Sequence, residues 1–150
     1  MLTVYPDTPG FVKDYIHENV RILNQHDDKS WAFAVGFVNS SFTGIAEMGN
    51  GDILVLERAF DNITKPFYIG LRQLKIAGCD AGGVCESTSL LILDSQREHN
   101  LDNFEGLAKI DDRRYLMVSD NNENKTQRNL LSLIVLRYSR NARIFIFITN

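Results

Sequence analysis

Short apolar runs, each bounded by polar or turn-forming residues, occupy most of the chain after residue 30. Runs of this length predict β-strands, and their regular spacing is typical of an all-β sandwich, barrel or propeller. The expected strands are Trp31–Val38, Phe42–Met48, Ile53–Phe60, Phe67–Ile76, Thr88–Asp94, Phe104–Ile110, Tyr115–Ser119, Leu130–Tyr138 and Ile144–Thr149. The pattern therefore predicts an all-β fold.

The N-terminal segment has a different pattern. Thr8 suits a helix cap and Pro9 suits the first helical position. Apolar residues then recur at helical spacing, at Phe11, Val12, Tyr15 and Ile16. We therefore expect a short N-terminal helix that ends at about Leu23.

An internal repeat refines the fold prediction. Phe42–Ala46 matches Phe104–Ala108, and without a gap Ile53–Leu56 falls on Tyr115–Val118, an offset of 62 residues. Each copy begins a run of four expected strands. Four-stranded units in tandem predict the blades of a β-propeller. The alternative is that two hairpins of a sandwich resemble each other by chance.

The repeat predicts one domain over 1–150 that holds about two blades and part of another. The blades span 31–138, with Trp31–Val38 as the outer strand of a preceding blade, while 1–30 is a poorly matched N-terminal segment and 139–150 is an atypical tail. A propeller needs about 4–8 blades to close. Missing blades or self-association are therefore expected, and the isolated chain should be oligomeric, aggregation-prone or partly unfolded.

Composition and charge narrow the classes of partner. The 150 residues carry a net charge of −3, and no basic face is evident, so nucleic acid is not an expected partner. No apolar run reaches membrane-spanning length, so no membrane is expected either. The residues after Met1 lack a basic start and the apolar stretch of a signal peptide. Either the protein is cytoplasmic or its true N-terminus is missing.

Two cysteines lie close together in Cys79–Cys85, with glycines between them. They form either a small disulfide ring or two loop thiols. Their loop is an insertion between the third and fourth strands of one expected blade. We therefore place the loop at the periphery and expect the loss of both cysteines to be tolerated.

Candidate chemistry gathers around one expected hairpin. The three histidines, His17, His26 and His99, lack metal-ligand spacing. By contrast, Asp102–Gly106 opens the hairpin and Ser119–Asn122 closes it with carboxylate and amide oxygens, which suit a hard cation such as calcium. The alternative is that Asp and Asn simply mark turns at strand ends.

These residues also carry a family resemblance. The segments Asp102–Ala108 and Tyr115–Asn122, followed by Gln127-Arg128, resemble the C-terminal part of phytase-like proteins, which are described as having esterase-like activity of the phytase family. The family's Leu-Glu-Arg strand end followed by an aromatic residue is matched by Leu56-Glu57-Arg58 with Phe60. Asp102–Gly106 is also similar to a segment of the calcium-dependent β-propeller phytases. The resemblance covers roughly residues 36 to 138.

The resemblance implies a propeller whose central channel holds acidic residues, calcium and a phosphoester substrate. Glu105 and Asp120 would be the catalytic carboxylates and cation ligands, with Asn121 and Asn122 as further ligands and Arg58 as a contact to the substrate anion. The first function hypothesis is therefore a truncated phosphoester hydrolase with a calcium-organised site. The second is a non-catalytic propeller fragment or interaction module.

The register of the two hairpins gives a geometric expectation. If Asn50-Gly51 forms a two-residue turn, Gly49 and Asp52 are the closing pair, and Thr43 faces Arg58. The repeat then places Glu105 opposite Asp120. Two facing carboxylates repel each other unless a cation lies between them.

Overall fold

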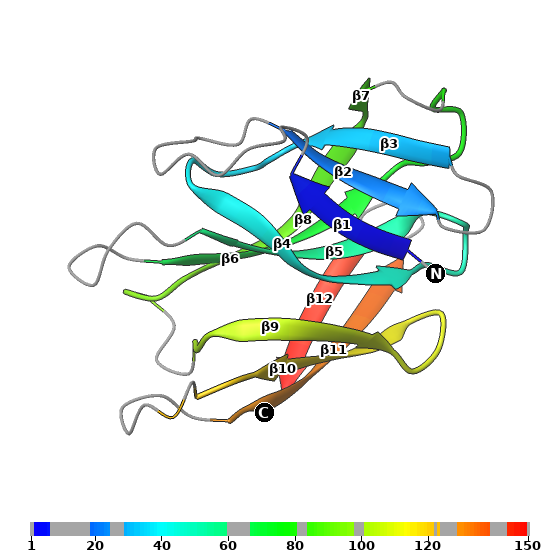
Figure 1. Ribbon diagram of the computed structural model, residues 1–150. Helices are drawn as coiled ribbons and strands as arrows, with labels where there is room; N and C mark the ends of the chain where they lie inside the picture. Colours follow the sequence, from blue (N-terminus) through cyan, green and yellow to red (C-terminus); the bar gives the residue numbers. More distant parts are fainter. Residues whose placement is uncertain are drawn as a thin grey trace.

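The computed structural model describes residues 2–6, 19–24, 29–59, 67–80, 84–97, 101–121, 123, 129–138 and 144–149 (Figure 1). These residues form twelve strands in three four-stranded sheets and contain no helix. The part of the chain described thus has no helix long and apolar enough to cross a membrane. The all-β prediction is confirmed, and each of the nine expected strands corresponds to an observed one.

The sheet in the middle, sheet B, contains β4 (Ser40–Glu47), β5 (Ile53–Ala59), β6 (Tyr68–Leu74) and β8 (Ser87–Asp94). Its neighbouring strands are all antiparallel. Side chains alternate between the two faces of a strand, and β5 is apolar on both. Leu54 and Leu56 join one buried cluster, while Ile53 and Val55 join another. Sheet B is therefore covered on both faces.

Sheet C covers one of these faces. It contains β9 (Phe104–Lys109), β10 (Arg114–Ser119), β11 (Leu131–Tyr138) and β12 (Ile144–Thr149), paired in chain order and antiparallel throughout. The buried cluster between the two sheets contains, from sheet C, Phe104, Tyr115, Met117, Ile134 and Leu136. These side chains pack on β5 and β6 of sheet B.

Sheet A covers the other face of sheet B. It contains β1 (Leu2–Pro6), β2 (Asn19–Asn24), β3 (Lys29–Ala34) and β7 (Val84–Cys85) in that order. The side chains of sheet A that belong to the buried cluster against sheet B are Ile22, Trp31, Phe33 and Cys85. Because β3 has a neighbour on each side, the expectation of Trp31–Val38 as an outer strand is wrong.

The expected helix is not confirmed. Its last part, from Asn19 to Leu23, forms most of β2, and residues 8–18 lie outside the described ranges. Ile22 lies opposite Trp31 in the pairing of β2 with β3 and is fully buried. Pairing along the whole of β2 and burial of Ile22 therefore outweigh the helical spacing of the local sequence.

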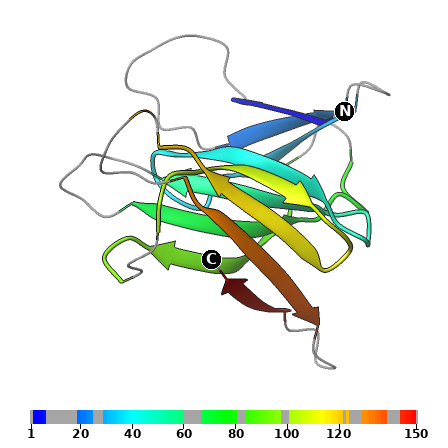
Figure 2. The same cartoon turned by 90° about the horizontal axis from the view of Figure 1, so that it is seen from below.

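The three sheets form a stack in the order A, B, C (Figures 1 and 2). Within the described residues they form neither a closed barrel nor a closed ring, so the propeller prediction is not confirmed. Sheets B and C each contain the four strands expected for one repeat unit, paired in chain order. The exception is β7, which lies between β6 and β8 in the sequence but pairs in sheet A.

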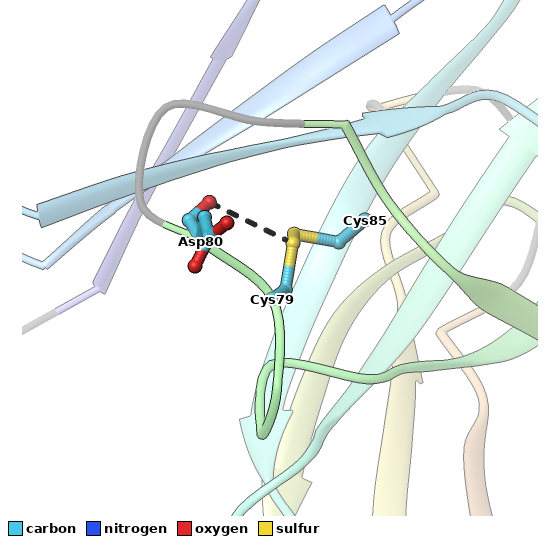
Figure 3. Close-up of a disulfide and its surroundings, with 3 residues drawn as sticks. All are labelled: Cys79, Asp80 and Cys85. Atoms are coloured by element: carbon cyan, nitrogen blue, oxygen red, sulfur yellow. Dashed lines mark hydrogen bonds between the residues drawn. A yellow bond between two sulfur atoms is a disulfide. The ribbon is translucent and has the colours of Figure 1, made fainter.

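Cys79 and Cys85 form a disulfide, with their Cα atoms 5.6 Å apart (Figure 3). The chain leaves β6, closes this ring, pairs β7 in parallel with β3, and returns to sheet B as β8. Cys85 is buried in the cluster between sheets A and B. The peripheral placement expected for this loop is therefore wrong for Cys85, because β7 completes sheet A.

Candidate functional site

The two repeated hairpins have a different register from the one expected. Met48 and Asp52 close the first turn, with the Met48 amide 2.8 Å from the Asp52 carbonyl oxygen. Gly51 has a φ of 84°, the left-handed conformation that ends a three-residue hairpin loop. The two-residue turn is therefore wrong, and every pair beyond it shifts by one residue.

A β-bulge shifts the register again in both hairpins. In the first, Phe42 pairs with Glu57 and Gly44 with Leu56, so Thr43 is the extra residue. In the second, Phe104 pairs with Ser119 and Gly106 with Val118, so Glu105 is the extra residue. The bulges lie at equivalent positions of the repeat, which supports genuine repetition. Neither Thr43 nor Glu105 has a directly facing partner, so the expected pairs with Arg58 and Asp120 are wrong.

The bulges lie where sheets B and C meet. The Thr43 hydroxyl donates to the Phe104 carbonyl oxygen at 3.1 Å, which connects β4 to β9. A Cβ atom on Gly44 would lie 2.8 Å from both the backbone nitrogen and the Cβ atom of Leu107. Glycine at this position thus permits the close approach of the two strands.

At this seam Arg58 meets Glu105. The Arg58 guanidinium, from β5, donates to Glu105 Oε1 at 3.3 Å, and the Asn103 side-chain amide donates to the same oxygen. The Arg58 and Glu105 side chains are 30% and 39% exposed, so a solute can reach both. The structure therefore brings together two of the candidate residues, from different sheets.

Asp120 lies beside this pair, at the end of β10. Its amide is 3.3 Å from the carbonyl oxygen of Asn103, whose side chain contacts Glu105. Asn121 follows, and its side-chain oxygen accepts from the Glu123 amide at 3.1 Å. Asn122 lies outside the described residues. The second hairpin thus gathers Glu105, Asp120 and Asn121 at one end of sheet C.

The described residues fit a calcium ion incompletely. Their oxygen atoms are of the right chemical kind, but calcium takes about 6–8 of them. No group of three or more His, Cys, Asp or Glu side chains able to hold a metal occurs in the described part of the chain. Glu105 Oε1 is also already engaged by Arg58 and Asn103.

A second charged pair lies nearby but is buried. Glu57, the residue before Arg58, has no exposed surface and accepts from Arg72 at 3.1 Å. It also accepts from the Gly36 amide at 2.7 Å and from the Ser40 hydroxyl. Arg72 further donates to the Ala34 carbonyl oxygen at 2.7 Å and to Ser87. Sequence reasoning assigned no role to either residue, although a glutamate within an apolar strand was a signal.

The buried pair fixes the segment between β3 and β4. The Gly36 amide and the Ser40 hydroxyl both bind Glu57, and the Phe37 ring between them stacks on Tyr68 with centroids 5.6 Å apart. Gly70 pairs with Glu57 across the sheet, and a Cβ atom there would lie 2.9 Å from the Phe37 ring. Glu57 is therefore a structural anchor for this segment.

At the other end of sheet C, the pKa values of Asp111 and Lys109 are shifted. The Arg113 amide, 2.9 Å from Oδ1 of Asp111, and the Arg114 side chain hold the pKa of Asp111 below its ordinary value. The hydrogen bond to Asp112, at 2.9 Å, raises the pKa of Lys109. This end is therefore a hydrogen-bonded charged turn, well removed along β9 and β10 from Glu105.

These features define an all-β protein of stacked, mostly antiparallel sheets with an arginine–carboxylate pair at an exposed seam. The family model described as phytase-like, esterase-like activity of phytase, matches residues 6–123. The chain therefore belongs to this family. The match begins nearer the N-terminus than the resemblance seen from motifs and includes Arg58, Glu105 and Asp120. No curated protein and no solved structure gives a significant match.

Proposed function

We propose that the chain is a hydrolase module of the phytase-like, esterase-like type that acts on phosphoesters. The observation that carries this proposal is the Arg58–Glu105 pair, because it places a cation and a carboxylate together where solvent reaches both. Family membership supports the reaction class. Fold alone would not, because one fold serves many reactions.

Each site residue has a proposed role. Arg58 has five N–H donors, so it can bind a phosphate oxygen while one donor remains on Glu105. Glu105 is the proposed base, which accepts a proton from the water that attacks phosphorus. Asp120 is the proposed acid, which gives a proton to the oxygen of the departing alcohol. The products are the alcohol and phosphate.

We propose that calcium binds at the same end of sheet C. Its protein ligands would be Glu105, Asp120, Asn121 and Asn122, and water would fill the remaining positions. The support is the hard-oxygen chemistry of these side chains. A cation bound there would attract a phosphate group. The incomplete ligand set favours weak binding by the isolated chain.

We also propose that sheets A, B and C are consecutive blades of a propeller-like assembly. Support comes from the four-stranded antiparallel order of sheets B and C and from the contact of their first strands, β4 and β9. A non-catalytic interaction module is the second candidate function. The observation that favours it is the exposed apolar pair Val118 and Leu131 on sheet C.

Phosphate release from phytate and from a simple aryl phosphate tests the hydrolase proposal, with calcium and with a chelator. We expect release by the unmodified chain and a loss of about tenfold or more in Arg58→Gln and Glu105→Gln. Matched controls are Arg97→Gln and Glu86→Gln, exposed charges just outside the two ends of β8 that should leave the rate unchanged. No release from either substrate by the folded chain would favour the non-catalytic module.

Calcium titration of the chain and of Glu105→Gln tests the metal proposal. We expect weak binding by the unmodified chain and weaker binding by the variant. Equal binding by both would remove Glu105 as a ligand. Equal calcium binding would say nothing about Arg58, because the role of Arg58 is tested separately, by phosphate release in the presence of a chelator.

A further inference from the structure

The outer face of sheet C, which points away from sheet B, is apolar where a solvated face would be polar. In β10, Tyr115 and Met117 point into the core, so Leu116 and Val118 lie on the outer face. In β11, Ile134 and Leu136 point inward, so the alternate positions Leu131, Leu133 and Val135 are outer. An antiparallel sheet with one face in water normally alternates apolar and polar residues.

The most exposed part of this face is one cross-strand pair. Val118 lies directly opposite Leu131, and the two residues are 49% and 59% exposed. Gly106 pairs with Val118 and Ala108 with Leu116, so β9 adds no charge to the face. In Figure 2, sheet C lies nearest the viewer, and no other described strand lies in front of it.

The internal repeat shows what such a face is built to do. Leu56 pairs with Leu71 in sheet B, at the place that Val118 and Leu131 occupy in sheet C. Both leucines are almost fully buried, because sheet C packs on them. The equivalent face of sheet C therefore has the side chains to accept another sheet.

We propose that the outer face of sheet C binds the outer face of sheet C of a second copy of this chain. The pairing is a two-fold, face-to-face packing of two apolar four-stranded sheets, and a two-fold dimer is the commonest oligomer. Its centre holds Leu116, Val118, Leu131, Leu133 and Val135 from each copy. No charged group in that set has to be desolvated.

The charges at the two ends of sheet C select the orientation. The end near the β9–β10 turn carries four basic and two acidic side chains, Lys109, Arg113, Arg114, Arg137, Asp111 and Asp112. Among the described residues, the opposite end carries the acidic side chains of Asp120 and Glu123, and also Glu105, which is paired with Arg58. With the strands of the two copies antiparallel, the basic end of each copy lies over the acidic end of the other.

The area of the face predicts a weak dimer. Four strands about 4.8 Å apart and six residues long, at about 3.4 Å per residue, give a plane of roughly 400 Å² per copy. Two copies then bury about 800 Å², which is at the low end for protein–protein interfaces. We therefore expect dimers that form and dissociate with concentration.

Sedimentation velocity across a wide range of chain concentration measures this association. We expect a monomer–dimer equilibrium that is lost in Val118→Lys and in Leu131→Lys. The matched control is Ile92→Lys, which changes an apolar residue of β8 that is 53% exposed and should dimerise like the unmodified chain. Circular dichroism checks that each variant is folded. A monomer at every concentration, open-ended aggregates, or equal dimerisation of the Leu131→Lys variant would overturn the proposal.

Two further readouts test which faces meet. Leu116→Cys and Leu133→Cys, which change a cross-strand pair near the middle of the face, should each give cross-linked dimers under mild oxidation, whereas Ile92→Cys should not. Absence of cross-linking in a chain that still dimerises would show that sheet C meets a different surface. Added salt should weaken the dimer, because opposite charges are apposed. Stronger association in salt would overturn the antiparallel orientation.

Discussion

Glu57 is a charged residue at the centre of the most buried strand, and its contacts explain why it is tolerated there. Arg72 neutralises its charge, and the Gly36 amide and Ser40 hydroxyl occupy its oxygens. Burying a charge is costly unless it is paired and hydrogen-bonded, and both conditions are met. The pair therefore fixes the conformation of the segment before β4 more than it adds to stability.

Removing one member of this pair should be strongly destabilising. We expect Glu57→Gln to lower the free energy of unfolding by about 3–5 kcal/mol, because Arg72 would stay buried without a counter-charge. The measurement is denaturant unfolding followed by circular dichroism. The control is Glu86→Gln, which breaks the exposed pair with Lys75 and should cost under about 1 kcal/mol. Equal costs would show that Glu57 is not the anchor described above.

For single residues, the sequence predicted which residues belong to the candidate site but did not predict which of them contact each other. The motifs picked out Arg58 and Glu105, and the structure places them together. The contact itself was not foreseen, because the turn after Met48 has three residues and each hairpin contains a bulge. The length of a turn and the position of a bulge both depend on local backbone geometry, which counting paired residues from an assumed turn does not predict.

The two bulged hairpins are the elements that join sheets B and C. Each bulge places its extra residue at the seam, Thr43 on β4 and Glu105 on β9. A bulge commonly redirects a side chain near a functional site. Here the one in β9 directs Glu105 toward Arg58 instead of toward a cross-strand neighbour.

The glycine after each bulge gives an internally matched test. In Gly44→Ala the new Cβ atom would meet backbone and Cβ atoms of Leu107 at 2.8 Å, so the strands must separate, at a cost of about 1–3 kcal/mol. In Gly106→Ala it would meet a methyl group of Val118, which is half exposed and can rotate away. Thermal unfolding should therefore show the larger loss for Gly44→Ala. A larger loss for Gly106→Ala would contradict the close approach of β4 and β9.

The disulfide element gives another comparison of two variants. Cys79→Ser removes the cross-link of a short loop, which the chain-entropy model values at about 2 kcal/mol. Cys85→Ser removes the same cross-link and also places a hydroxyl among Trp31 and Phe33, so it should cost about 1–3 kcal/mol more. Both are measured by denaturant unfolding without reductant. Equal losses of unfolding free energy in the two variants would indicate that Cys85 is peripheral, as the sequence predicted for the whole loop.

Elements with strong local patterns were predictable, and elements made by distant pairing were not. The apolar runs located β3 to β6 and β8 to β12 to within a few residues. β2 was expected as helix because the pairing of Ile22 with Trp31 is not visible in the local sequence. β7 has two residues and exists because β3 offers an edge to it.

At the scale of the whole molecule, the stack depends on sheet B having two apolar faces. Its strand β5 supplies Leu54 and Leu56 to one core and Ile53 and Val55 to the other. A run of buried residues in the sequence indicates such a strand but does not give the number of sheets stacked on it. The repeat predicted successive four-stranded units, whereas the arrangement of the described sheets is a stack and not a closed ring.

The parallel strand β7 also sets an order of events while the protein is being synthesised. Val84 pairs with Ala32, so sheet A needs residues made 52 positions later, 84 minus 32. At about 5–20 residues per second, a ribosome takes roughly 3 to 10 s to supply them. β4, β5 and β6 are made in that interval, so sheet B can begin to assemble while β3 still has an open edge. The N-terminal sheet is thus completed only after much of the middle sheet exists, and the nascent chain should be most open to edge-binding chaperones during that interval.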